Sequence, residues 1–335
     1  MNIEASYLGL RLKSPVVASA SSLSYTLDGV RRLAASGVGA IVMHSLFEEE
    51  ITGEADRRAR LLEAGTESYA ESLSYFPEPA PQGASKRHLN LLERAASLSD
   101  VPVIGSLNAT APGGWVAHAQ EMESAGAAGI ELNVYMLPAS PQDGGRSVEA
   151  RHVELLQMVK SAVRVPVAVK LGPFFSSIGE VAAMLDAAGA DGLVLFARFV
   201  HPDIDPELMR IVPGIGLSSP FESRLSRTWI SLLHGKVRAS IAGATGVDQA
   251  EDVIKYLLAG ADVVMTASSL LRHGPTHAQD LVDGVSAWMA RKGFQSLADF
   301  RGMLSGSGDG DGAAEERAAY VDALRAANAK SQGPW

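Results

Sequence analysis

The stretch Ala188-Gly189-Ala190-Asp191-Gly192-Leu193-Val194-Leu195-Phe196 contains the pattern that decides the fold of this chain. A helical pattern ends in a small residue and a glycine, and a short apolar run follows directly. Glycine accepts the left-handed conformation that ends many helices. The stretch therefore predicts a helix, a tight turn and a strand, and related stretches occur at residues 36–43, 125–132 and 259–265.

Further apolar runs bring the number of predicted strands to eight. They are short and continuous rather than alternating, as in parallel sheets that are buried on both faces. They cover residues 15–19, 39–44, 102–106, 129–134, 166–171, 192–197, 238–243 and 262–267. Helical patterns lie between most of them, so we predict an α/β protein that folds as a closed (β/α)8 TIM barrel. An open doubly wound sheet is the alternative, although no G-x-G-x-x-G follows the first strand.

Three regions interrupt the regular spacing and define the expected organisation. Residues 45–100 and 198–236 are predicted insertions after strands two and six, and residues 305–312 alternate serine or aspartate with glycine, as in a flexible linker. We expect a barrel over residues 1–303, a linker over 304–312 and a helical tail over 313–335. The tail could pack on the barrel or on a second subunit.

The composition excludes several classes of function. The 335 residues include no cysteine, which excludes disulfides, thiolate zinc sites and a cysteine nucleophile. A net charge of −9 disfavours binding to nucleic acid. The sequence contains no run of eighteen apolar residues, so we expect no membrane span. The first residues also lack the pattern of a secretion signal. We expect a cytoplasmic protein without a metal site.

Polar residues follow the predicted strands, at the end of a barrel where catalytic groups lie. They include Ser19, His44, Asn133, Tyr135 and Lys170. Strands seven and eight run into small-residue loops at 243–246 and 266–269, each followed by a helix. Such loops present backbone N–H groups that suit a phosphate, and in barrels they frequently bind one. Ordinary strand-to-helix turns are the alternative interpretation.

Lys170 and Asn133 are the two strand-end residues with the clearest chemical potential. A cation at Lys170 could stabilise an anionic cofactor ring, form a Schiff base or bind a carboxylate. The alternative is a structural ion pair with Glu131. Asn133 suits a hydrogen bond to a heteroaromatic edge, and a buried amide satisfied by the protein is its alternative.

Several of these motifs together resemble a known family. They are Ala18-Ser19-Ala20, Glu131-Leu132-Asn133-Val134, Val169-Lys170-Leu171, the two small-residue loops, and the stretch from Lys292 to Gly302. Over about residues 3–303 the chain resembles the dihydroorotate dehydrogenase family of FMN-dependent barrels, and more closely its bacterial branch of dihydroorotate dehydrogenase-like proteins. The resemblance implies FMN across the top of the barrel, with Lys170 near the flavin N1 and O2. The cofactor-binding residues that it implies are Ala18, Ser19, His44, Asn133, Lys170, Gly243, Thr245, Gly246, Thr266, Ala267 and Ser268.

The chain departs from the family on the substrate side. Met136 stands at the position of the catalytic base, and His44 replaces a lysine. Residues 73–76, Pro138 and Ala197 stand where the family has substrate-binding asparagines. Thr245 replaces a glycine of the phosphate loop. Because orotate needs several amide hydrogen bonds around its ring, these losses predict a substrate other than dihydroorotate.

We therefore expect an FMN-dependent oxidoreductase that transfers hydride between a small planar or carbonyl-bearing substrate and flavin N5. His44, Tyr75 and Tyr135 are the candidate catalytic acids or bases, since histidine titrates near neutral pH and tyrosine carries a proton. Expected partners are a small-molecule substrate, a second copy in a homodimer and an electron-transfer partner. Two alternatives are a barrel that has lost catalysis and serves as a scaffold, and a flavin-free barrel that acts on a sugar phosphate through a Lys170 Schiff base.

Overall fold

The computed structural model describes residues 1–47, 49–50, 83–108, 115–136, 138–198, 202–212, 216–306 and 312–331. In the last of these segments, side chains are described for residues 317–326. The candidate base Tyr75 and the rest of residues 73–76 lie outside the described residues.

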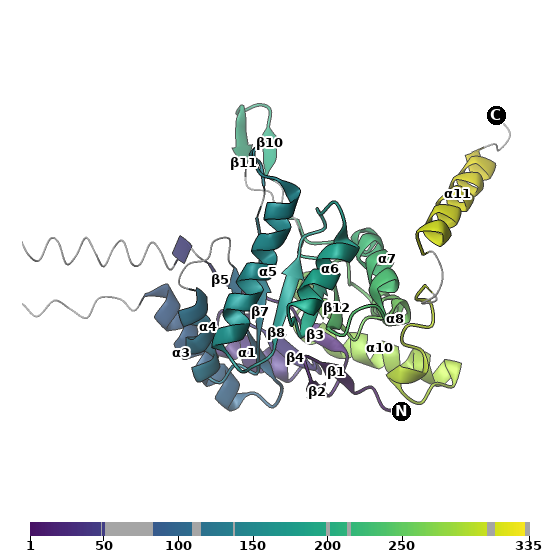
Figure 1. The fold of residues 1–335 in the computed structure, drawn as a ribbon. Helices are drawn as coiled ribbons and strands as arrows, with labels where there is room; N and C mark the ends of the chain where they lie inside the picture. The colour runs from purple at the N-terminus through teal and green to yellow at the C-terminus, as the bar shows by residue number, and fades with distance from the viewer. Residues whose placement is uncertain are drawn as a thin grey trace, which may run out of the picture.

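Eight parallel strands form the barrel at the centre of the molecule (Figure 1). Each coincides with one predicted strand. They are β3 (Val16–Ala18), β4 (Ala40–Val42), β6 (Val103–Asn108), β7 (Gly129–Asn133), β8 (Val167–Leu171), β9 (Gly192–Leu195), β12 (Ser240–Ala244) and β13 (Val263–Thr266). A pairing of β4 with β6 closes the ring, so the barrel prediction is confirmed and the open sheet is wrong. The short strand β5 (Leu46–Phe47) pairs with the end of β6.

Helices surround the barrel and connect its strands. They are α1 (Leu27–Ala34), α3 (Ala84–Leu98), α4 (Trp115–Ser124), α5 (Gly145–Ala162), α6 (Ile178–Ala187), α7 (Ser223–Leu233), α8 (Ala250–Ala259), α9 (Ser268–His273) and α10 (His277–Lys292), with short 3-10 helices η1 (Ser22–Ser24), η2 (Pro220–Glu222) and η3 (Leu297–Asp299). Helices α3 and α7 fall inside the two predicted insertions. Both insertions therefore contain a regular barrel helix, and the second also contains the hairpin of β10 (Asp203–Asp205) and β11 (Arg210–Val212).

The glycines of the repeated pattern end helices as the sequence predicts. Gly37, Gly126, Gly189 and Gly260 have φ angles of +86°, +90°, +93° and +114°. Residues other than glycine rarely adopt these φ values, because their Cβ atom would lie too close to the following carbonyl oxygen. Each of these residues leads into a barrel strand within a few residues, so the turn sets where the strand begins.

An antiparallel hairpin of β1 (Ala5–Tyr7) and β2 (Leu10–Leu12) lies at the N-terminal end of the barrel, and the sequence patterns did not predict it. The backbone N–H of Leu8 donates to Ser240 Oγ at 3.2 Å. A Cβ atom at Gly192 would lie 2.6 Å from Leu8 Cδ2, and one at Gly129 would lie 3.2 Å from Leu8 Cδ1. Glycine at the start of β7 and of β9 thus leaves room for Leu8.

The barrel extends slightly beyond its predicted end. The backbone N–H of Leu304 donates to Leu258 O at 2.9 Å, and that of Gly306 donates to Ser231 O at 3.2 Å. The tail helix α11 (Gly312–Ser331) is drawn apart from the barrel in Figure 1, and its Tyr320 and Leu324 are 60% and 47% exposed. No helix among the described residues is both long and apolar enough for a membrane span.

Gly243 in β12 provides a test of how helix α8 packs on the barrel. A Cβ atom there would lie 2.4 Å from Cδ1 of the buried Tyr256 ring. We predict that Gly243→Ala lowers the free energy of unfolding by about 1–3 kcal/mol, the usual cost of overpacking a core. Gly179→Ala in helix α6 is the control. With nothing within 4 Å of its Cβ, it should keep or raise stability in urea denaturation. Equal effects of the two substitutions would contradict the packing argument.

Candidate active site

A cavity of about 190 Å³ lies where the barrel strands end. Its described lining includes nine of the predicted site residues, which are Ser19, Asn133, Tyr135, Lys170, Thr245, Gly246, Thr266, Ala267 and Ser268. These residues come from both halves of the sequence, and barrel closure brings them together. Ala18, His44 and Gly243 are not among the lining residues, and Gly243 instead packs against Tyr256.

Lys170 is a buried cation at the edge of this cavity, with 8% of its surface exposed. Its Nζ donates to Glu131 Oε1 and to Ser19 Oγ, both at 3.2 Å. The ion pair with Glu131 that the sequence left open is therefore present. Because the carboxylate compensates the buried positive charge, Lys170 can remain at the cavity without water around it.

Asn133 has a polar atom that the protein leaves unsatisfied. Its Oδ1 is buried and has no hydrogen-bond partner among the described residues. A buried carbonyl oxygen without a partner costs about 1–3 kcal/mol. Since Asn133 lines the cavity, a bound molecule with an N–H or O–H group would remove this cost.

The loop after β12 has a backbone shape that demands glycine at position 246 and accommodates threonine at the position before it. Gly246 has φ +71°, and its Cβ would lie 2.6 Å from Ser223 N and 2.7 Å from Ser219 O. Thr245 has φ +77°, which is unusual for a β-branched residue. Its hydroxyl donates to Phe196 O at 3.1 Å, which helps to hold this conformation.

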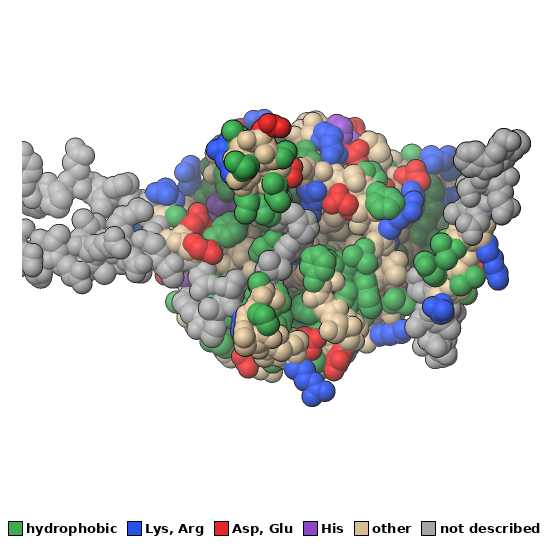
Figure 2. Space-filling view, turned by 90° about the horizontal axis from the view of Figure 1, so that it is seen from above, with side chains coloured by type: hydrophobic (Ala, Val, Ile, Leu, Met, Phe, Trp, Pro, Cys, Tyr) green, Lys and Arg blue, Asp and Glu red, His purple; other side chains and the backbone are tan. Residues whose placement is uncertain are grey.

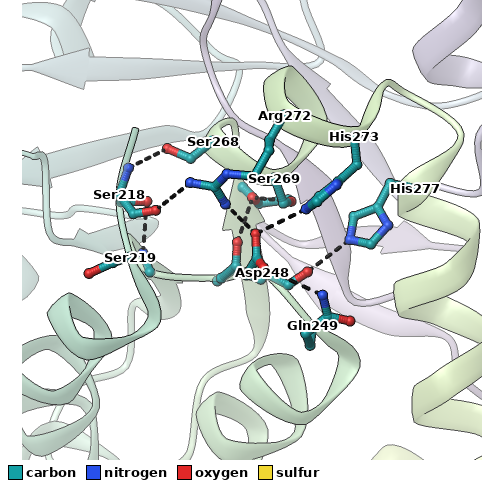
Figure 3. A network of polar contacts seen from close by, with 12 residues as sticks. Ser218, Ser219, Asp248, Gln249, Ser268, Ser269, Arg272, His273 and His277 are labelled. Atoms are coloured by element: carbon teal, nitrogen blue, oxygen red, sulfur yellow. Dashed lines mark hydrogen bonds and ion pairs between the residues drawn. The ribbon is translucent and has the colours of Figure 1, made fainter. Parts of the chain in front are cut away.

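Ser218 joins the two predicted phosphate loops (Figure 3). Its Oγ accepts from Gly246 N at 3.2 Å, and its backbone N–H donates to Ser268 Oγ at 3.0 Å. Arg272 Nη2 donates to Ser218 O at 3.0 Å while Nη1 pairs with Asp248. No local pattern pointed to Ser218 or Arg272, because their partners lie 24 to 54 positions away along the chain.

Asp248 is the anionic centre of this network. Partial burial acts to raise the pKa of its carboxyl group, but hydrogen bonds from Gln249 and Arg272 outweigh it and leave the pKa below its usual value. His277 Nε2 lies 2.8 Å from the backbone oxygen of Asp248, and the rings of His273 and His277 are 4.6 Å apart. The network thus ties the loop after β12 to helices α9 and α10.

His44 uses both of its ring nitrogens inside the protein. Nδ1 lies 3.1 Å from Ser24 O, and Nε2 lies 3.0 Å from His88 Nδ1. Because a carbonyl oxygen can only accept, Nδ1 of His44 carries the proton and Nε2 accepts from His88. His88 Nε2 is buried and has no partner among the described residues. His44 therefore faces His88 rather than the cavity.

A second cavity, of about 270 Å³, adjoins the first. Both cavities are lined by Tyr135 and Ala197. The second is also lined by Met136 and Pro138, so three positions at which the sequence resemblance implies a departure from the family pattern lie around one space. Its described lining is Val134, Tyr135, Met136, Pro138, Val148, His152, Gly172, Phe174, Phe175 and Ala197. His152 was not singled out from the sequence, because a lone histidine within a helical pattern gives no functional signal.

The buried His88 predicts a specific pH dependence of the free energy of unfolding. Burial, followed by the charges of His44 and His118, lowers the pKa of His88 from 6.5 to about 3. Between pH 6.5 and pH 3 the unfolded chain binds a proton at His88 that the folded chain does not bind. The contribution of His88 to the free energy of unfolding is therefore complete above pH 6.5 and decreases as the pH falls toward 3. From about pH 7.5 to about pH 5, His88 should account for a loss of about 2 kcal/mol.

The matched variant is His88→Gln, which cannot take up this proton. In urea denaturation at the two pH values, the variant should lose about 2 kcal/mol less than the wild-type chain. Identical losses in the two proteins would show that His88 is not the group responsible.

Comparisons with known proteins agree with the barrel fold. The family model described as dihydroorotate dehydrogenase matches residues 2–289. A protein of Aeropyrum pernix named "Putative dihydroorotate dehydrogenase A (fumarate)" is 29% identical, covering 90% of this chain and 96% of its own length. The "Dihydroorotate dehydrogenase B (NAD(+)), catalytic subunit" of Methanothermobacter thermautotrophicus is 25% identical over 90% and 98% of the two chains. The "Dihydroorotate dehydrogenase A (fumarate)" of Lactobacillus helveticus is 26% identical over 91% and 99%. The chain belongs to the dihydroorotate dehydrogenase family, whose members are FMN-dependent oxidoreductases.

Proposed function

We propose that this member of the family transfers hydride between FMN and a small substrate other than dihydroorotate. The observation that carries the proposal is the second cavity. Met136, Pro138 and Ala197 all line it, where the family pattern has a base and two asparagines. None of these three side chains can donate or accept the hydrogen bonds that the ring of dihydroorotate requires, and unpaired polar groups in a site are costly.

The first cavity fits FMN by the chemistry of its residues. The unpartnered Oδ1 of Asn133 would accept a hydrogen bond from the flavin ring, and the Lys170 cation would stabilise negative charge on it. The loop of Thr245 and Gly246 and the stretch from Thr266 to Ser268 would hold the phosphate through small residues and backbone N–H groups. When bound, FMN supplies a hydride acceptor or donor at N5.

Tyr135 is the best placed of the three acid or base candidates from the sequence. It lines both cavities, so it lies between the proposed cofactor and substrate positions. His44 has both ring nitrogens in hydrogen bonds within the protein. Tyr75 lies outside the described residues, and its role stays a prediction.

The two other functions considered from the sequence have less support. A Schiff base needs a neutral lysine amine, and Lys170 Nζ pairs with the Glu131 carboxylate as an ammonium. A scaffold without catalysis has no need for a buried cation and an unsatisfied amide at one cavity, and membership of an oxidoreductase family does not favour it.

The proposal extends to the partners of the enzyme. We propose a cytoplasmic homodimer that passes electrons from the reduced cofactor to a separate acceptor. The names of the relatives specify fumarate or NAD(+), which supports a separate electron acceptor without identifying it. Size-exclusion chromatography with light scattering would measure the oligomeric state.

The purified protein tests both halves of the proposal. It should be yellow and release FMN on denaturation. Under anaerobic conditions dithionite should bleach the bound flavin, whereas a large excess of dihydroorotate should leave it oxidised. Dithionite is the control that shows a reducible flavin. Rapid bleaching by dihydroorotate would overturn the substrate claim, and colourless protein that takes up no added FMN would overturn the cofactor claim.

A variant at Asn133 tests the fit of the cofactor. Asn133→Leu keeps a side chain of similar length but removes the buried amide oxygen. We predict that FMN binds roughly 2- to 10-fold more weakly, the change expected for one neutral hydrogen bond. Fluorescence titration of the apoprotein with FMN measures it. Unchanged affinity would mean that Asn133 does not contact the cofactor.

A further inference from the structure

The second cavity is apolar and without charge along its described walls. Its lining includes valine, methionine, proline, alanine and two phenylalanines, and it has no Lys, Arg, Asp or Glu among the described residues. Its polar side chains in this set are Tyr135 and His152. An ionised carboxylate bound here would lose its hydration, while the nearest cation described, Arg151, lies behind Met136 and does not line the cavity, so its binding would cost several kcal/mol.

His152 brings a buried imidazole to this cavity from helix α5. The side chain is 3% exposed, and its ring packs edge-on against Phe175 with the ring centres 5.1 Å apart. Phe175 comes from the loop after β8, so the ring is held between two elements of the barrel. Its orientation is therefore fixed by packing rather than by solvent.

The hydrogen bonds of His152 determine which nitrogen carries the proton. Nδ1 lies 2.8 Å from Val148 O one turn earlier in the helix, and a carbonyl can only accept. Nδ1 is thus the donor, and Nε2 of the neutral ring carries a free lone pair. Nε2 makes no hydrogen bond to the described residues. Burial first, and then the charge of Arg151, lower the pKa of this ring, which keeps it neutral near pH 7.

We propose that the second cavity binds the substrate as a compact, uncharged ring compound with one hydrogen-bond donor, and that His152 Nε2 accepts that hydrogen bond. The inference rests on the proposed function, because it takes this cavity as the substrate side of the flavin. It adds the chemical class of the substrate and a residue that contacts it. Phe174 and Phe175 provide flat apolar surface for a ring, and Tyr135 and Ala197 connect it to the cofactor cavity.

Met136 explains why another side chain is needed for this contact. Its sulfur lies 2.7 Å from Arg151 Nη1 and is a weak acceptor at best. The residue at the family's base position thus points its sulfur to a neighbouring cation on α5. His152, next to Arg151 in the sequence, offers the stronger acceptor from the same helix.

Three small probes of similar size test the proposal on the FMN-bound protein. Phenol has a ring and a donor, anisole has the ring without the donor, and benzoate has the ring with a negative charge. Phenol should bind roughly 2- to 10-fold more tightly than anisole, the ratio that one neutral hydrogen bond gives. Benzoate should bind more weakly than both. Calorimetry measures the affinities, and the ¹⁵N resonance of His152 Nε2 should move with phenol but not with anisole.

Two variants assign the effect to His152. His152→Leu should bind phenol and anisole equally, whereas His152→Gln retains an acceptor and should keep part of the preference. Met158→Leu, on the same helix with its side chain 37% exposed, is the control and should behave as the wild-type protein. Thermal unfolding by circular dichroism checks that each variant is folded, and the glutamine variant keeps the test valid if the leucine variant is not.

The outcomes separate this inference from the proposed function. Equal affinities for phenol and anisole in the wild-type protein, or a preference that survives in His152→Leu, would overturn the role of His152. Benzoate binding as tightly as phenol would overturn the uncharged class. Flavin absorbance on the same samples reports cofactor binding independently. If protein without flavin still binds phenol more tightly than anisole, the claim that FMN is the cofactor is overturned and the proposed role of His152 is supported.

Discussion

Closure of the barrel is the constraint on which the rest of the structure depends. Backbone hydrogen bonds from Ile41 N to Pro102 O at 3.0 Å and from Met43 N to Ile104 O at 2.9 Å join β4 to β6 and complete the ring. Once the ring is closed, the carboxyl ends of all eight strands meet around one axis. Residues as distant as Ser19 and Lys170, 151 positions apart, then lie within 3.2 Å of each other. Without closure neither cavity would exist.

The two cavities differ in how they balance polar groups. The first places a cation, Lys170, against Glu131 and leaves Asn133 Oδ1 to be satisfied by what binds there. The second is lined by apolar side chains with a single oriented imidazole, His152. A shared wall of Tyr135 and Ala197 joins the polar cavity, where we propose that the cofactor binds, to the apolar cavity that we propose for the substrate. Apart from Tyr135 and Ala197, different residues line the two cavities, so a substitution at Met136 or Pro138 can change the second cavity without altering the lining of the first.

The parts of the molecule that depend on local pattern could be predicted from sequence. The helix-ending glycine before four of the strands and the apolar runs of all eight are local signals, and they located the barrel strands. The polar residues that follow the strands, with the family resemblance, located nine residues around the first cavity. Contacts that depend on distant partners could not be found in this way. Ser218 and Arg272 were missed because nothing near them in the sequence records their neighbours. His152 was missed because its place in α5 fits an ordinary helix, and Leu8 because its hairpin is short and its partners come much later.

That last contact has a consequence for how the chain is made. Leu8 precedes all eight barrel strands in the chain, yet its backbone N–H bonds to Ser240 Oγ, 232 positions later. During translation the hairpin of β1 and β2 therefore waits, with Tyr7, Leu8 and Leu12 still exposed, until most of the barrel has left the ribosome. Because exposed apolar surface favours aggregation, the hairpin stays vulnerable until β12 has folded and these side chains are buried.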